Sequence, residues 1–205
     1  MDTLSKILAH KIVVIIRGAR PADFLKIAGA LRDGGLHIME ITLNSPSALA
    51  MISMAAKENS MLIGAGTVLD AASAKAAISA GAKFIISPTL DPETIFATKQ
   101  LDAVSIPGAF TATEILAAYS RGADIVKVFP ASVGPGYFRD IRGPLPYIPL
   151  MPTGGLNLSN IRAYQDAGAV AFGVGSALID TSREMTPAYL QQVTEEARQY
   201  VEAVK

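Results

Sequence analysis

The chain has 205 residues, half of them hydrophobic, which is enough to bury one substantial core but short for two independent domains. Lysine plus arginine and aspartate plus glutamate each total 18, so no net charge favours a nucleic acid or an anionic membrane surface as a partner. Cysteine is absent, which excludes disulfides, thiolate metal ligands and a cysteine nucleophile, and is typical of a cytoplasmic protein.

Short runs rich in valine, isoleucine and leucine recur along the chain, and several are apolar on both faces, as in a parallel sheet that is covered on both sides. These runs predict eight strands, over 12–16, 37–41, 61–64, 84–87, 103–106, 124–128, 148–151 and 171–174. Between them, apolar residues at helical spacing predict helices over 21–32, 47–58, 71–80, 92–99, 112–120 and 159–167. We expect a further helix over 2–9 and a closing helix over 187–204. No secretion signal or membrane span is expected.

Four glycine-centred tripeptides each lie just before a predicted strand, where glycine can take the left-handed conformation that ends a helix. They are Gly34-Gly35-Leu36, Ala80-Gly81-Ala82, Arg121-Gly122-Ala123 and Ala167-Gly168-Ala169. Eight strand and helix units in about 200 residues match the lower size limit of a (β/α)8 TIM barrel. We therefore predict an α/β fold, a single (β/α)8 barrel domain over 1–205. The competing fold is a doubly wound open sheet.

Lys127 is the one lysine that lies inside a predicted strand. Alternation places Lys127 on one face with Ile125 and Phe129, whereas Val126 and Val128 face the other way. A buried ammonium is rare unless it is paired, and burial lowers the pKa of a lysine, which frees the amine to attack a carbonyl. The position therefore indicates either a catalytic nucleophile or a structural lysine that reaches solvent or pairs with an acid.

Three more polar side chains close predicted strands, where the active sites of (β/α)8 barrels gather. Glu40 ends the second strand, where its carboxylate either pairs with Lys127 and moves protons or forms a purely structural ion pair. Arg17 follows the first strand, and its guanidinium is suited either to bind a substrate carboxylate or to form a salt bridge with a loop acid. Thr67 ends the third strand and can donate its hydroxyl to the same carboxylate or to a keto oxygen.

Two glycine-rich turns, at 152–155 and 173–176, follow the last two predicted strands. Barrels often bind phosphate there, through free backbone N–H groups and a helix N-terminus. Either turn alone is common, but the two together at the expected strands predict a phosphate site. The phosphate would lie near Gly154, Gly155, Gly175 and Ser176, with Thr153 as a further substrate contact.

Histidine is scarce: only His10 and His37 are present, and neither ends a predicted strand with a second ligand nearby. We therefore expect both to be structural or solvent-facing, and we expect no metal cofactor. A hydrolase with a Ser-His-Asp triad is disfavoured by the same shortage.

Short motifs in a fixed order resemble the 2-keto-3-deoxy-6-phosphogluconate and 4-hydroxy-2-oxoglutarate aldolases. They span almost the whole chain, and their combination is far more specific than any one of them. The segments are IIRG (15–18), MEITL (39–43), IGAGTV (63–68), ISP (86–88), PG (107–108), VKVFPA (126–131), MPTGG (151–155) and GVGS (173–176).

The resemblance implies a class I aldolase, in which Lys127 forms a Schiff base with a 2-keto acid and Glu40 transfers protons. The implied substrate is a phosphorylated 2-keto-3-deoxy sugar acid cleaved to pyruvate and D-glyceraldehyde 3-phosphate, or 4-hydroxy-2-oxoglutarate cleaved to pyruvate and glyoxylate. No cofactor is implied besides the lysine imine, and known members are homotrimers without a metal. The implied contacts are Arg17 and Thr67 at the carboxylate, and Pro88 and Phe129 around the imine.

One segment departs from the family pattern. Where some members carry an arginine after the second strand, this chain has Leu43-Asn44-Ser45-Pro46, so we expect Arg17 alone to bind the keto-acid carboxylate. The Asn-Ser-Pro segment also resembles the branch that acts on 2-dehydro-3-deoxy-6-phosphogalactonate, the C4 epimer, and the choice between epimers stays open here. Two other functions stay open as well: a phosphate-binding barrel isomerase that needs no imine, and a barrel that only binds a phosphorylated metabolite.

Overall fold

Parallel strands alternate with helices along the whole chain in the computed structural model, which describes residues 1–205. The strands are β1 (Ile12–Ile16), β2 (Ile38–Thr42), β3 (Leu62–Gly66), β4 (Phe84–Ile86), β5 (Val104–Ile106), β6 (Gly108–Ala109), β7 (Val126–Val128), β8 (Leu150–Pro152) and β9 (Phe172–Val174). The helices are α1 (Thr3–His10), α2 (Pro21–Asp33), α3 (Ala48–Glu58), α4 (Ala71–Ser79), α5 (Pro92–Gln100), α6 (Ala112–Ser120), α7 (Pro135–Arg142), α8 (Ile161–Asp166) and α9 (Pro187–Ala203), with a 3-10 turn η1 (Ala131–Val133).

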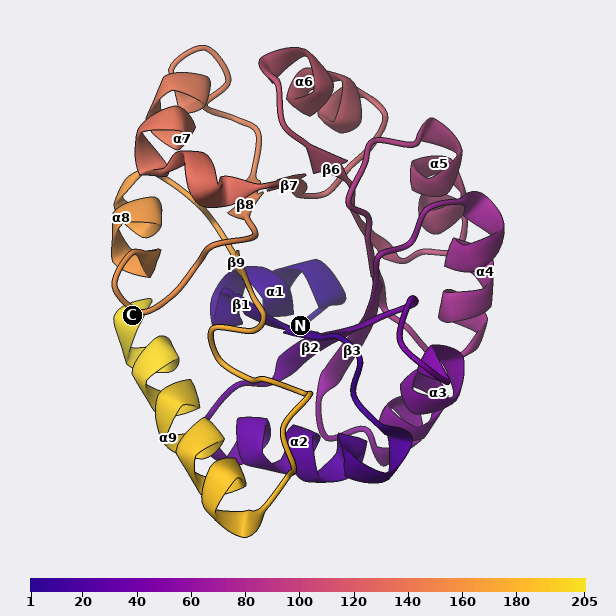
Figure 1. Cartoon of the computed structure of the whole chain (residues 1–205). Helices are drawn as coiled ribbons and strands as arrows, with labels where there is room; N and C mark the ends of the chain where they lie inside the picture. Colours follow the sequence, from indigo (N-terminus) through magenta and orange to yellow (C-terminus); the bar gives the residue numbers. More distant parts are fainter.

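The strands form two parallel sheets. Six of them pair in the order β5-β4-β3-β2-β1-β9, and β6-β7-β8 form the second sheet. Pro107 separates β5 from β6, and a parallel bridge between Thr153 and Gly173 joins the end of β8 to β9. Figure 1 shows the strands in the middle of the molecule with helices α2 to α9 around them. The predicted α/β class with parallel strands is confirmed.

The strand alternation predicted around Lys127 is confirmed by two separate hydrophobic clusters. Val126 and Val128 belong to the large cluster, which also holds the buried faces of the surrounding helices. Ile125 belongs to a small cluster that it shares with residues of both sheets and with the N-terminal helix. That small cluster is Ile7, Val13, Ile38, Phe84, Ile86, Val104, Ile106, Ile125, Met151 and Ala171.

Helix α1 covers the N-terminal ends of the strands. Its Ile7 is fully buried in the small cluster, and Figure 1 shows α1 inside the circle of the other helices. The carboxylate of Asp2 caps the helix by accepting a hydrogen bond of 2.7 Å from the N–H of Ser5. With α1 closing one end, the opposite, C-terminal ends of the strands are left to form a site.

The predicted glycine turns are confirmed, because the central residues Gly35, Gly81, Gly122 and Gly168 all have positive φ. Two predictions need correction. The run 103–106 continues past Pro107 as β6 in the second sheet, since proline has no N–H to extend the ladder of β5. Helix α7 was not expected; it begins at Pro135, and its buried Phe138 and Ile141 pack into the large cluster.

Candidate active site

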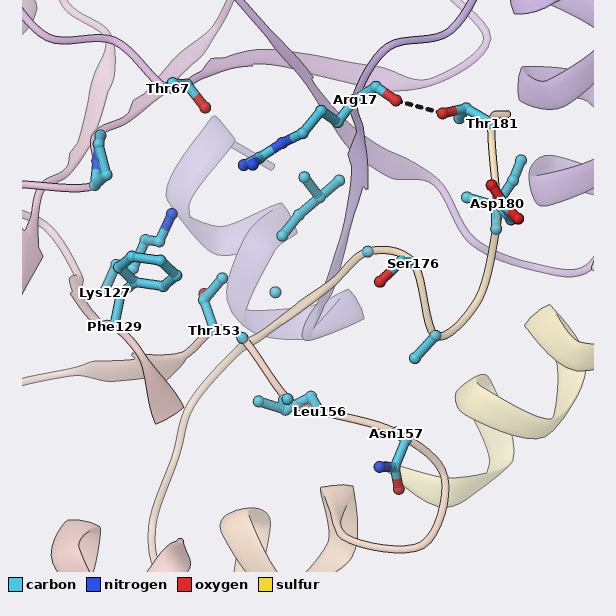
Figure 2. Close-up of a pocket in the computed structure, with 18 residues that line it drawn as sticks. Arg17, Thr67, Lys127, Phe129, Thr153, Leu156, Asn157, Ser176, Asp180 and Thr181 are labelled. Carbon is cyan, nitrogen blue, oxygen red and sulfur yellow. Dashed lines mark hydrogen bonds between the residues drawn. The ribbon is translucent and has the colours of Figure 1, made fainter. Parts of the chain in front are cut away.

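A cavity of about 570 Å³ opens at the C-terminal ends of the strands. It collects residues that end or follow β1, β3, β4, β7, β8 and β9, elements that are far apart in the sequence. Every predicted site residue except Glu40 lines this cavity: Arg17, Thr67, Pro88, Lys127, Phe129, Thr153, Gly154, Gly155, Gly175 and Ser176. Figure 2 shows Lys127 and Arg17 extending into the same space from different sides.

Lys127, in the middle of β7, brings its amine into this cavity although its side chain is only 5% exposed. The Nζ atom lies 5.1 Å from the ring centroid of Phe129, and no carboxylate lies within 4.0 Å of it. Burial lowers the pKa of Lys127; the charge of Glu40 opposes this shift, and the charge of Arg17 adds to it. A buried amine with a lowered pKa is a nucleophile at a lower pH than an exposed lysine.

Glu40 lies in β2, beside the cavity but not among the residues that line it. It is 1% exposed, and its Oε2 has no hydrogen-bond partner. The carboxyl group rests on Gly66 of β3, where a Cβ atom would lie 2.5 Å from the Glu40 Cδ. Burial raises the pKa of Glu40, and the charges of Lys127 and Arg17 oppose that rise.

The contact ion pair expected between Glu40 and Lys127 is not formed. The two groups lie on β2 and β7, in different sheets, and are coupled through space instead. An unpartnered carboxyl group of raised pKa is able to hold or release a proton at a pH nearer to neutral than an ordinary glutamate.

Arg17 and Thr67, the two residues predicted to contact the substrate carboxylate, both line the cavity. The Arg17 guanidinium lines the cavity without a salt bridge, while its backbone carbonyl accepts a hydrogen bond from the Thr181 hydroxyl (Figure 2). Thr67 has φ 55°, a left-handed conformation that is costly for a β-branched residue. Strain of this kind is often found at functional sites, and here it accompanies a threonine that lines the cavity.

The two glycine turns present backbone donors to the cavity. The N–H groups of Gly154, Gly155 and Leu156, after β8, donate no hydrogen bond within the protein, and neither do those of Gly175, Ser176 and Ala177, after β9. Gly154 and Gly155 have φ values of 88° and 80°, which only glycine adopts without strain. The buried Thr153 Oγ1 also lacks a partner. This side of the cavity therefore has backbone donors with no partner in the protein.

Several lining residues were not predicted. Ile15, Leu156, Asn157, Ile179, Asp180 and Thr181 also face the cavity. The loop after β9 carries Asp180, whose pKa is lowered by hydrogen bonds from the Ser182 hydroxyl and N–H. Nothing in the sequence marks this loop except its place after the last strand.

The two histidines lie away from this cavity and line another one, together with residues of α1. No three histidine, cysteine, aspartate or glutamate side chains gather anywhere in the chain in a way that could hold a metal ion. None of the helices combines the length and the apolar character needed to cross a bilayer.

Comparison with known proteins agrees with this geometry. The family model described as KDPG and KHG aldolase matches residues 4–195. The chain is 38% identical to a probable 2-dehydro-3-deoxy-6-phosphogalactonate aldolase of Rhizobium meliloti, over 83% of this chain and 82% of the relative. It is 39% identical to a 2-dehydro-3-deoxy-phosphogluconate aldolase of Pseudomonas aeruginosa, over 80% of this chain and 75% of the relative.

A solved structure is also similar. It is the KDPG aldolase of Legionella pneumophila, crystallised with pyruvate captured as a covalent carbinolamine intermediate. It superposes with a TM-score of 0.85 and 27% identity, and the match covers 96% of this chain and 97% of that chain. The chain belongs to the KDPG and KHG aldolase family.

Proposed function

We propose that the protein is a class I aldolase that cleaves 2-dehydro-3-deoxy-6-phosphogluconate to pyruvate and D-glyceraldehyde 3-phosphate. Cleavage of 4-hydroxy-2-oxoglutarate to pyruvate and glyoxylate is proposed for the same site. The observation that carries the proposal is the amine of Lys127, which is buried, free of any ion pair and open to the cavity. Family membership supports the reaction class.

The proposed reaction begins when the neutral amine of Lys127 attacks the C2 keto carbon. The hydroxyl of the resulting carbinolamine takes up a proton from solvent and leaves as water, so that the imine nitrogen keeps its own proton and is positively charged. The C3–C4 bond then breaks: its electron pair moves toward the imine nitrogen, and the C4 hydroxyl gives its proton to Glu40 as the aldehyde carbonyl forms. The resulting enamine regains a proton at C3 from Glu40. Water then adds to the protonated imine, pyruvate leaves, and the proton taken up at imine formation returns to solvent as Lys127 becomes a neutral amine again.

The guanidinium of Arg17 and the free backbone donors of the glycine turns fit the two anionic ends of such a substrate. The unpaired guanidinium of Arg17 would bind the keto-acid carboxylate, and Thr67 would donate its hydroxyl to the same group. Pro88 and Phe129 would pack around the imine. The phosphate would lie between the free N–H groups of the two glycine turns. These neutral groups would donate hydrogen bonds to it without a charged side chain.

A second candidate substrate is 2-dehydro-3-deoxy-6-phosphogalactonate. It is favoured by the name of the Rhizobium relative and by the segment that follows β2. Asn44 in that segment is exposed and does not line the cavity, which leaves Arg17 as the only guanidinium that does. Ser45 accepts a hydrogen bond of 2.8 Å from the N–H of Gly18 and so links this segment to the chain beside Arg17.

We further propose that the two sheets close into a (β/α)8 barrel that forms one domain over 1–205. Support comes from the bridge between Thr153 and Gly173, and from the 2.9 Å hydrogen bond between the Lys127 N–H and the Pro107 carbonyl. The small hydrophobic cluster draws on both sheets, as the interior of a barrel does. A homotrimer and a cytoplasmic location are proposed from family membership alone.

Steady-state cleavage of the gluconate and galactonate epimers tests the proposal, with pyruvate release followed through lactate dehydrogenase and NADH. At least one epimer should be cleaved, and Lys127→Ala should abolish cleavage while leaving the circular dichroism spectrum unchanged. Lys57→Ala, at an exposed lysine on α3, is the matched control and should keep wild-type activity. Turnover that persists in Lys127→Ala, or isomerisation without pyruvate release, would contradict the proposal.

A further inference from the structure

A second cavity of about 420 Å³ lies at the other end of the strands, where the proposed reaction has no role for it. Helix α1 forms one wall with Asp2, Thr3, Lys6 and His10. The facing wall comes from residues at the starts of β2, β3 and β4 and from the end of α3. The two cavities are thus reached from opposite ends of the same strands.

Most of the titratable side chains that line the second cavity are basic. Lys6, His10, His37 and Lys83 line it, and Asp2 is its only acidic residue. The Asp2 carboxylate accepts the N–H of Ser5 as the cap of α1. The chain as a whole has no net charge, so this local excess of positive charge is a property of the cavity and not of the composition.

The positive charges in this cavity have no partner within the protein. Neither the Lys6 nor the Lys83 ammonium makes a salt bridge or a hydrogen bond. Glu58, at the end of the neighbouring α3, contacts Arg32 and Ser60 instead. Lysines on an exposed face are commonly unpaired, but here two of them converge with two imidazoles on one hollow.

The two imidazoles make the cavity sensitive to pH. The rings of His10 and His37 meet edge to face, with 5.2 Å between their centroids. Burial lowers the pKa of His10, and the positive charges of His37 and Lys6 lower it further. Lys83 and Asp2 are the other charged side chains that line this hollow. An anion bound beside the rings would offset the repulsion and favour the protonated imidazole.

We propose that this second cavity binds a small molecule through a dianionic phosphate group. Ammonium and imidazolium groups donate as point charges, which suits a tetrahedral phosphate, whereas no arginine is present to hold a planar carboxylate at two points. Asn59 and Ser60 add polar side chains to the same wall. The ligand is either free phosphate or a phosphate ester, and both share this chemistry. Because the site is separate from Lys127, the proposal does not depend on the aldolase reaction.

The histidines supply a selective probe, because the chain has only two and both line this cavity. Proton NMR of their C–H signals, recorded as a function of pH, should show inorganic phosphate raising the pKa of His10 relative to chloride at equal ionic strength. The rise should reach about half a unit or more, because a nearby opposite charge favours the charged form. The affinity for the phosphate dianion, corrected for the fraction of phosphate that is dianionic at each pH, should weaken as the pH rises through that pKa.

Two variants separate this site from the first cavity. Lys6→Gln combined with Lys83→Gln should remove the phosphate effect on the His10 pKa, whereas Lys75→Gln, at an exposed lysine on α4, should retain it. Equal histidine titrations in phosphate and chloride would overturn the proposal, and so would a phosphate effect that survives in the double variant. Glycerol 3-phosphate distinguishes the sources: tighter binding than inorganic phosphate identifies a phosphate ester, and equal binding identifies free phosphate.

Discussion

Gly66→Ala tests whether the placement of Glu40 governs turnover. The added Cβ would lie 2.5 Å from the Glu40 Cδ and 2.7 Å from each carboxylate oxygen, whereas carbon atoms in contact are normally about 3.5 Å apart. The carboxyl group must therefore move by about 1 Å, and a displacement of that size is able to lower a catalytic rate about 100-fold. Gly66 does not have positive φ, so backbone strain adds nothing to the effect.

Stability gives a second measure of the same contact. Overpacking a buried site costs about 1–3 kcal/mol, and urea unfolding of Gly66→Ala should show a loss in that range. The loss should disappear in a Glu40→Ala background, where no carboxyl group is left to collide. Gly29→Ala is the control, because nothing lies within 4 Å of its Cβ, and removing a helical glycine should stabilise the fold by about 0.5–1 kcal/mol. A Gly66→Ala enzyme with wild-type kcat would refute the reasoning.

Three further variants test separate parts of the site. Glu40→Gln should still form the pyruvate imine but turn over about 10²- to 10⁴-fold more slowly, and a wild-type rate would reject proton transfer by this residue. Burial raises the Glu40 pKa, so its contribution to stability is complete below about pH 4.3, the value of an exposed glutamate, and is lost as the pH rises through the folded-state pKa. In urea titrations Glu40→Gln should therefore raise the free energy of unfolding more at about pH 7.5 than at about pH 4.5; an equal change at both would show that burial is not the cause. Thr67→Gly should raise the free energy of unfolding by roughly 1–2 kcal/mol, because glycine adopts the left-handed conformation without strain. The same variant should raise KM for the keto acid. A lower free energy of unfolding would contradict the presence of strain at this residue. Gly155→Ala, at φ 80°, should raise KM for the phosphorylated substrate and leave pyruvate trapping unchanged; an unchanged KM would place the phosphate elsewhere.

Much of the fold follows from local patterns in the sequence. Strand β1 has the predicted bounds, because five consecutive apolar β-branched residues leave no ambiguity in a sheet that is covered on both faces. The break at Pro107 and the helix α7 were harder to predict. Both depend on how the chain passes from one sheet to the other, which is a property of tertiary structure and not of local spacing.

In the candidate site, too, the features that depend on local sequence were predictable, and those that depend on tertiary packing were not. The positions of Arg17, Thr67 and Lys127 at the ends or within strands were predictable, since parallel strands bring their C-terminal ends to one side. The deep burial of Glu40 was not predictable, because its carboxyl group occupies the space that a Cβ atom at Gly66, in the neighbouring strand, would fill. Asp180 was missed because its loop carries no motif, and only the folded chain brings it to the cavity.

The most direct test of the central claim is reduction with borohydride in the presence of pyruvate, followed by peptide mass mapping. We predict one stable adduct, a carboxyethyl group on the Nζ atom of Lys127, which is absent from Lys127→Ala. An unmodified protein, or an adduct on an exposed lysine such as Lys57, would contradict the assignment of the buried amine as the nucleophile.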